Sequence, residues 1–136
     1  NLTKAVLFGA GLRDADLYRA DLYQANLKEA NLRHASLRFA DLTEAKLTGA
    51  TLSFAHLTCA HLVGADLSGV SFKGTNLTGA NLSRSDLRGA NFTDANLTDT
   101  LFEGALISVS TFHTISAVGS GAIFRNVHVE QDYAQK

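Results

Sequence analysis

Residues 15–19 read Ala-Asp-Leu-Tyr-Arg, and the phrase returns as Ala-Asp-Leu-Tyr-Gln at 20–24 and as Ala-Asn-Leu-Lys-Glu at 25–29. On both sides of this stretch, Leu, Phe or Ile occupies every fifth position from Leu2 to Phe112, which makes 23 positions in succession. Two residues before each of these positions from Leu7 onward stands a small side chain, which is Ala in 17 of 22 cases. The chain is therefore a tandem repeat with a period of five.

A period of five fits neither regular element. An α-helix repeats its apolar face about every 3.6 positions and a strand every second one, so the Leu positions would form no stripe on either. A short extended segment followed by a corner fits better: Ala15 and Leu17 point inward, Asp16 points outward, and Tyr18 and Arg19 make the corner. Eight of the chain's 11 glycines stand at the last position of the phrase, which predicts a positive φ there.

The phrase resembles the A-(D/N)-L-x-x pattern of the pentapeptide repeat family, from residue 1 to about residue 117. The resemblance implies an all-β fold, a right-handed quadrilateral β-helix with four phrases per coil and nearly six coils. Residues four phrases apart would then stack, which places Phe72, Phe92 and Phe112 in one internal column above Leu12, Leu32 and Leu52. We expect residues 1–117 to form the β-helix and residues 118–136 a degenerate C-terminal cap or tail.

Composition limits the possible partners. Twelve basic and 13 acidic residues give a net charge of −1, which favours neither nucleic acid nor an anionic membrane as a partner. The one cysteine, Cys59, excludes an internal disulfide framework. No apolar run approaches the length of a transmembrane helix. We expect a soluble protein, with the cytoplasm slightly favoured, although a removed signal peptide or a larger parent protein stays open.

Two sets of residues are candidate interaction sites. Stacking places Tyr18 beneath Arg38 and Arg19 beneath Phe39, with Tyr23 around the next corner, and interfaces favour these residue types. The alternative is that these side chains merely cover one another through cation–π contacts. At the other end, Leu101, Leu106 and Val109 replace residues that are mostly polar in earlier coils, and a solenoid end needs a cover. We expect an end cap or a dimer surface there, made by the tail, a partner or a second copy.

The tail itself carries a weak continuation of the pattern. After Ala117 the frame breaks at residues 119–121, and residues 122–124 and 127–129 then resemble two degenerate phrases shifted by two positions. The remaining residues to Lys136 are polar, and we expect them to fray.

Catalytic and metal-binding sites are not expected. His61 beside Asp41 permits a catalytic pair, but an exposed ion pair or amide ladder is the simpler explanation on a convex rod without a cleft. His56, Cys59 and His61 match no usual zinc spacing. We therefore expect no enzyme, no cofactor and no bound metal.

Three functions are compatible with these features. The first is a rigid scaffold that binds an unidentified protein through its flat faces, with a homodimer through one rod end as a further possibility. The second comes from the resemblance: some bacterial pentapeptide repeat proteins mimic DNA and bind DNA gyrase or a related topoisomerase. That role implies a strongly acidic surface, whereas this chain is near neutral. The third is ice binding through the column Thr58, Thr78 and Thr98.

Overall fold

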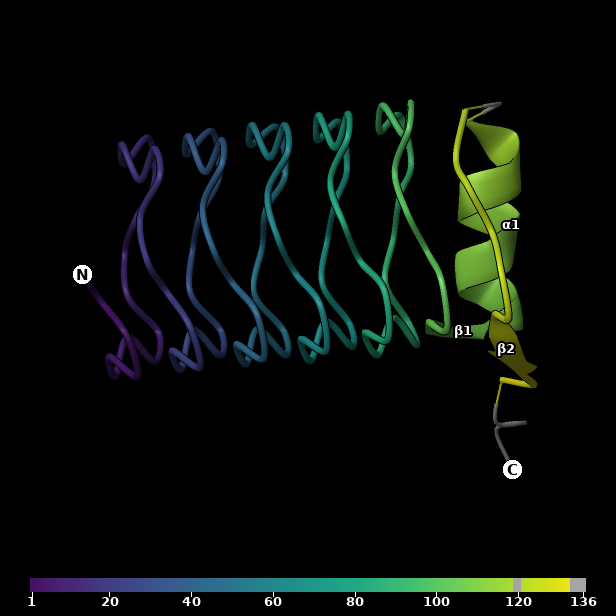
Figure 1. Cartoon of the computed structure of the whole chain (residues 1–136), viewed down its shortest axis with the longest axis horizontal. Coiled ribbons are helices and arrows are strands. Elements are labelled where there is room, and N and C mark those ends of the chain that lie inside the picture. Colours follow the sequence, from purple (N-terminus) through teal and green to yellow (C-terminus); the bar gives the residue numbers. More distant parts are fainter. Residues whose placement is uncertain (119–120, 133–136) are drawn as a thin grey trace.

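The computed structural model describes residues 1–118 and 121–132, which form a rod of stacked coils closed at the C-terminal end by a helix (Figure 1). Its named elements follow in the order β1 (Leu106–Ser108), α1 (Val109–Ala117) and β2 (His128–Glu130). The predicted frame break at residues 119–120 and residues 133–136 of the tail lie outside the described residues.

Each coil of the rod consists of four phrases. Isolated parallel bridges join the outward residue of a phrase to its counterpart four phrases later, as in Val6–Asn26, Asn26–Lys46 and Lys46–Asp66. The walls of the rod are thus single bridges and not long strands, because every phrase turns a corner after a short extended segment. The four-phrase coil is confirmed.

One phrase shows how neighbouring repeats satisfy the backbone of each other. In residues 25–29 all five backbone N–H groups have acceptors, and two of these acceptors lie in the next coil and one in the preceding coil. Leu27 N donates to Lys46 O at 2.7 Å, and Asn26 N donates to Ala5 O at 2.9 Å. Lys28 N donates to the side-chain oxygen of Asn26 at 3.2 Å, an Asx turn that explains the preference for Asp or Asn before Leu. Repetition therefore satisfies the backbone without continuous strands.

The corners confirm the prediction of positive φ. All eight glycines at the last position of the phrase have φ between 66° and 73°. The same conformation recurs at 13 other corners without glycine, as at Arg19 (φ 58°) and Phe39 (φ 59°). Gly is thus the easier choice at this position but is not required.

The core is a column of inward Leu, Phe and Ala. From Leu22 to Ile107, the apolar inward side chains are at most 6% exposed. Phe72 and Phe92 stack at 4.8 Å as expected, and Phe102 meets Phe92 edge-on at 5.8 Å. The non-alanine positions Thr75 and Thr100 are also buried, and each hydroxyl donates to a backbone carbonyl oxygen, that of Leu52 and that of Leu77.

The prediction fails at Phe112. Residues 109–117, expected to continue the β-helix, form α1, and Phe112 is 45% exposed instead of joining the internal column. Val109 provides the physical reason. A regular corner requires a positive φ at this position, which a β-branched residue adopts poorly. Ser108 instead caps a helix, with its side-chain oxygen accepting from Thr111 N.

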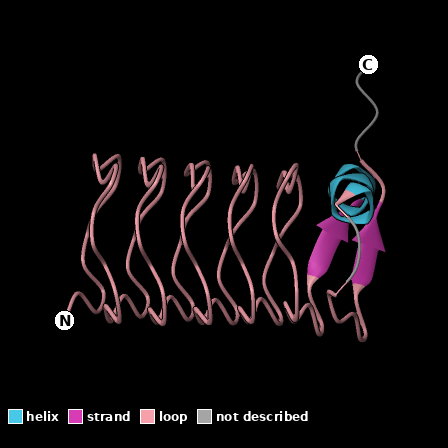
Figure 2. Cartoon of the chain, turned by 90° about the horizontal axis from the view of Figure 1, so that it is seen from above, coloured by secondary structure: helices cyan, strands magenta, loops and turns pink. Residues whose placement is uncertain are grey.

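The tail resumes the coil after α1. Leu101 bridges to Ile123 and Leu106 pairs with His128, so each partner lies two positions further along the chain than in the regular coils. This confirms the two degenerate phrases shifted by two positions. Phe124 stacks on Phe102 at 5.0 Å and extends the aromatic column at the rod end. Figure 2 shows α1 beside β1 and β2 at this end of the rod.

Candidate functional site

Two corners of adjacent coils bring the predicted patch together. The bridge between Asp16 and Ser36 aligns the walls, and Arg19 N donates to Arg38 O at 2.9 Å, which aligns the corners. Tyr18 and Phe39 are 46% and 43% exposed. The backbone thus holds two large aromatic side chains at the surface in fixed positions.

The side chains of this corner contact one another. The rings of Tyr18 and Phe39 meet edge to face at 6.0 Å. The guanidinium of Arg19 lies 5.3 Å from the Tyr18 ring and 5.8 Å from the Phe39 ring, and that of Arg38 lies 5.5 Å from Tyr18. We call these four residues the Tyr18 cluster. Both interpretations from the sequence meet here, because the contacts are cation–π contacts and the aromatic side chains nevertheless stay exposed.

Tyr23 lies apart from this cluster. Its hydroxyl donates to Glu44 Oε2 at 3.0 Å, and Gln24 Nε2 donates to the same oxygen at 2.8 Å. The hydrogen bond to the Glu44 carboxylate raises the pKa of the Tyr23 hydroxyl. Tyr23 belongs to a separate polar corner.

A second aromatic corner was missed in the sequence. The rings of His34 and Phe54 stack at 5.3 Å with an interplanar angle of 13°, and the Arg33 guanidinium lies 5.4 Å from the Phe54 ring. We call Arg33, His34 and Phe54 the Phe54 cluster. The stacking of successive coils that aligned Tyr18 with Arg38 also aligns His34 with Phe54, so the signal was present in the same pattern.

The two clusters border one wall. Residues 15–17, 35–37 and 55–57 form what we call the fourth wall; the Phe54 cluster precedes it in the chain and the Tyr18 cluster follows it. On its surface, Asp16, Tyr18, Ser36 and Arg38 line a hollow of about 320 Å³. The Asp16 carboxylate accepts from Tyr18 N at 3.1 Å. Aromatic, cationic and hydrogen-bonding groups thus gather on one side of the rod.

The predicted end residues lie under the chain's own tail. Leu101 and Leu106 are half-buried and pair with residues 123 and 128, and Val109 begins α1. A second hollow of about 320 Å³ opens at this end between Arg88, Gly89, Ser108 and the segment 130–132. The tail and α1 therefore cover at least part of this end.

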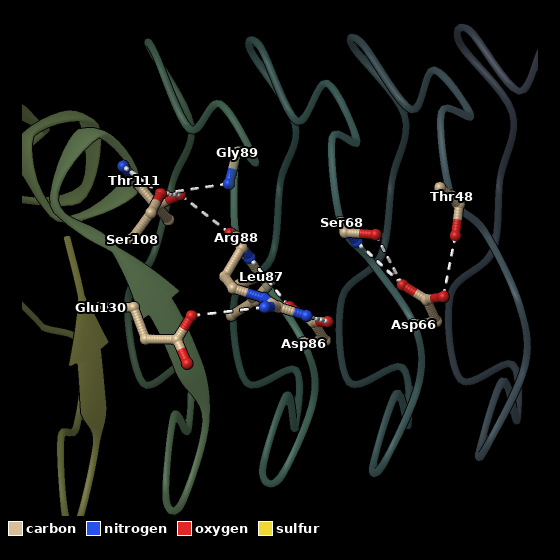
Figure 3. A network of polar contacts seen from close by, with 10 residues as sticks. All are labelled: Thr48, Asp66, Ser68, Asp86, Leu87, Arg88, Gly89, Ser108, Thr111 and Glu130. Carbon is tan, nitrogen blue, oxygen red and sulfur yellow. Dashed lines mark hydrogen bonds and ion pairs between the residues drawn. The ribbon is translucent and has the colours of Figure 1, made fainter. Parts of the chain in front are cut away.

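Polar contacts fasten this end to the last coils (Figure 3). Arg88 donates to both carboxylate oxygens of Asp86 at 3.0 and 2.7 Å and forms an ion pair with Glu130 at 3.3 Å. Hydrogen bonding to Asp86, more than to Glu130, raises the pKa of Arg88. One coil away, burial raises the pKa of Asp66, but hydrogen bonds from Ser68 and Thr48 outweigh it and leave that pKa below its ordinary value. These contacts link neighbouring coils and the tail.

Other candidate groups are less organised. His61 and Asp41 are backbone-bridged neighbours on an outer wall. Within residues 1–118 and 121–132, no group of three His, Cys, Asp or Glu side chains is placed to hold a metal ion. In the same part of the chain, no helix has the length and apolar character needed to cross a membrane.

Comparison with known proteins places this architecture in a family. The model for pentapeptide repeats matches residues 1–38, 35–74 and 65–104. No curated protein sequence matches significantly. Among solved structures, the pentapeptide repeat protein Rfr23 from the cyanobacterium Cyanothece 51142 is 34% identical with a TM-score of 0.62 over 81% of this chain. This chain spans 64% of the length of Rfr23.

Two further structures share the fold. HetL, a pentapeptide repeat protein involved in heterocyst differentiation regulation in Nostoc sp. strain PCC 7120, is 29% identical with a TM-score of 0.51, covering 94% of this chain and 68% of HetL. QnrB1, a plasmid-mediated fluoroquinolone resistance protein, is 20% identical with a TM-score of 0.52, covering 81% of this chain and 64% of QnrB1. At that identity, the likeness to QnrB1 concerns the fold alone. The chain belongs to the pentapeptide repeat family.

Proposed function

We propose that this protein is a non-enzymatic scaffold that binds another protein through the Tyr18 cluster. The observation that supports this most is the exposure of Tyr18 and Phe39 beside two arginines on a rigid corner. Tyr and Arg are among the residues that dominate binding energy at interfaces. Because the coil ladder already fixes the backbone, binding would order little more than side chains, which lowers its entropic cost.

The walls leave side chains as the means of recognition. In the regular coils, the N–H groups of a phrase such as 25–29 are all used by the coil ladder, by the corner turn that bonds Ala25 N to Leu22 O, and by the Asx turn. A partner strand cannot add to such a wall by backbone pairing, in contrast to an open sheet edge. Specificity must then come from the lattice of corner side chains, in which the Tyr18 cluster presents two exposed aromatic rings.

A pull-down from a lysate of the source organism, read by mass spectrometry, tests this proposal. We expect the double variant Tyr18→Ser, Phe39→Ser to lose a partner that the wild type retains, with at least a tenfold loss of affinity (about 1.4 kcal/mol). The matched control is Tyr23→Ser, an aromatic substitution at the neighbouring corner, which should retain the partner. Thermal denaturation should show nearly equal stability for wild type and double variant, since both side chains are exposed. Retention of every partner by the double variant would overturn the proposal.

The two other functions have less support. A DNA-mimicking role requires a strongly acidic surface, whereas the net charge is −1 and the fourth wall is bordered by arginines. Ice binding requires a free array of hydroxyls, but Thr78 and Thr98 donate theirs to Asn76 and Asn96 at 2.7 and 2.8 Å. A supercoiling assay and a thermal-hysteresis measurement test these roles directly.

The finer expectations belong to the same proposal. We take the rod to be a right-handed quadrilateral β-helix, as the family resemblance implies, and the protein to be bacterial, with the cytoplasm slightly favoured as its compartment. A homodimer through the C-terminal end is supported by exposed Phe112, Phe124 and Val129 near Leu101, Leu106 and Val109. Light scattering over a range of concentrations tests the dimer, and a monomer at every concentration would exclude it.

A further inference from the structure

We infer that the fourth wall and its two aromatic corners bind an acidic segment of a partner protein that carries an aromatic anchor residue. This inference rests on the proposed scaffold function and specifies the chemistry of the partner. It also extends the site from the Tyr18 cluster to the Phe54 cluster, since one segment crossing the wall meets both.

The first argument concerns which arginine side chains form ion pairs and which lie over aromatic rings. Within residues 1–118 and 121–132, Arg13 pairs with Asp14 and Arg88 pairs with Asp86 and Glu130, whereas Arg19, Arg33 and Arg38 form no ion pair. Each of these three instead lies over an aromatic ring. A guanidinium over a ring keeps its N–H edge available for bidentate binding of a carboxylate. Three such groups on the two borders of one wall favour a partner with several carboxylates.

The local charge is the second argument. Residues 31–40 contain Arg33 and Arg38 and no acidic residue, and residues 51–60 contain no Asp, Glu, Lys or Arg. The near-neutral net charge therefore conceals a basic region on this side of the second coil. Asp16 is the carboxylate lining the nearby hollow, and its Oδ1 already accepts a backbone hydrogen bond. Charge complementarity thus favours an acidic partner and gives it a preferred side of the rod.

The hollow is the third argument. Its volume of about 320 Å³ and its lining by Tyr18 and Arg38 suit one aromatic side chain, which would be flanked by a ring and a guanidinium. Nucleic acid suits the site less well, because affinity for a phosphate backbone grows with the number of cationic contacts and the two clusters offer three arginines. A protein segment with alternating carboxylates and one aromatic residue matches these groups better.

Titration of the ¹⁵N-labelled protein with the peptide Glu-Asp-Tyr-Asp-Glu, followed by NMR, tests the inference. We expect saturable shifts of the Nε–H signals of Arg19, Arg33 and Arg38, detectable even at a Kd of about 1 mM. The affinity should fall several-fold between about 50 and about 300 mM salt. The amide counterpart Gln-Asn-Tyr-Asn-Gln should bind at least tenfold more weakly.

Variants test whether the acidic peptide binds at this site or is attracted to the protein non-specifically. The double variant Arg33→Gln, Arg38→Gln should lower peptide affinity at least tenfold. The matched control is Arg84→Gln, since Arg84 also lacks an ion pair among the described residues but lies over no ring there. Absence of shifts up to millimolar peptide, equal binding of the amide peptide, shifts elsewhere on the rod, or tighter binding of an oligonucleotide would each overturn the inference.

The two proposals can fail separately. If a natural partner is lost with the Tyr18, Phe39 double variant but retained by the Arg33, Arg38 double variant, the scaffold function holds and the acidic segment does not. If the acidic peptide binds at the fourth wall while the Tyr18, Phe39 double variant retains every protein partner, the acidic-segment site holds and the proposed scaffold function through the Tyr18 cluster does not.

Discussion

The regular coils and the C-terminal end satisfy their backbone hydrogen-bonding groups in two different ways. In the coils, each phrase finds its backbone partners in a copy of itself one coil away, as when Leu27 N donates to Lys46 O. At the C-terminal end, α1 stands where the copy of residues 89–92 would lie, and side chains of α1 and its cap supply the missing acceptors. Ser108 Oγ accepts from Gly89 N at 3.1 Å, and Thr114 Oγ1 accepts from Phe92 N at 3.2 Å.

This difference shows what a repeat can and cannot do. Repetition satisfies interior coils with any sequence that keeps the period, whereas the end depends on individual Ser and Thr residues at particular places. A helix is a suitable final element, because it satisfies most of its own backbone and needs little from a next coil.

The largest expected effect is the difference in stability between two truncations. One removes a core side chain inside the coils, and the other removes the side chain at the equivalent position of the repeat in α1. Leu67→Ala removes a side chain that is 0% exposed and should lower the free energy of unfolding by about 2–5 kcal/mol. Phe112→Ala, at a position with the same place in the five-residue period, should change it by less than about 0.5 kcal/mol because Phe112 is exposed. Denaturant unfolding of both variants measures the contrast. Equal costs would mean that the column of inward residues continues through residue 112.

Two corner glycines of the regular coils test how much the stability depends on the space around a corner. At Gly69 a Cβ would meet no atom within 4 Å, so Gly69→Ala should cost only the left-handed conformation, about 1–2 kcal/mol. At Gly74 a Cβ would lie 2.6 Å from the Phe54 ring, so Gly74→Ala should cost more. The difference in unfolding free energy between the two should shrink in a Phe54→Ala background. A difference that persists there would place its cause outside the Phe54 contact.

A buried hydroxyl tests the dependence of the end on single side chains. Thr111 is 0% exposed and its hydroxyl donates to Leu87 O at 2.8 Å. Thr111→Val keeps the shape and should cost about 1 kcal/mol of unfolding free energy, whereas Thr111→Ser keeps the hydroxyl and loses a methyl group. Hydrogen exchange of the last coil should rise in the Val variant. Unchanged exchange would show that α1 is held without this bond.

The smallest effect concerns pH. The Asp66 pKa lies below its ordinary value of 3.8, so this group stabilises the fold above that pH, and the contribution is lost as pH falls through the folded-state pKa. Asp66→Asn should flatten the loss of stability below about pH 4, and Ser68→Ala should do so partially because it removes one of the lowering hydrogen bonds. Thermal melts between about pH 2 and pH 6 measure both. An unchanged acid dependence would contradict this assignment.

The sequence indicated much of the candidate site but not its extent. Stacking of successive coils predicted that Tyr18, Arg19, Arg38 and Phe39 meet, and they do. It also placed Tyr23 around the next corner, where the Tyr23 hydroxyl donates to Glu44. The same stacking aligns His34 with Phe54 and so could have indicated the Phe54 cluster, whereas the contact between the two rings depends on side-chain torsions that a period does not specify.

The five-residue period is enough to specify the coil. A period of five with Leu inside and a corner position favouring Gly permits few structures, because each phrase must bury one face and turn. The place where the coil stops depends instead on contacts between segments that are distant in the chain. Residues 109–113 keep the five-residue spacing, yet Val109 suits a left-handed corner poorly and the walls beneath need donors and acceptors that α1 and its cap supply. Through residue 108, the repeat pattern and the hydrogen-bonding needs of the neighbouring walls favour the same structure. Beyond it the unsatisfied end of the rod selects a helix and a coil that is longer by two positions, in which Leu106 pairs with His128.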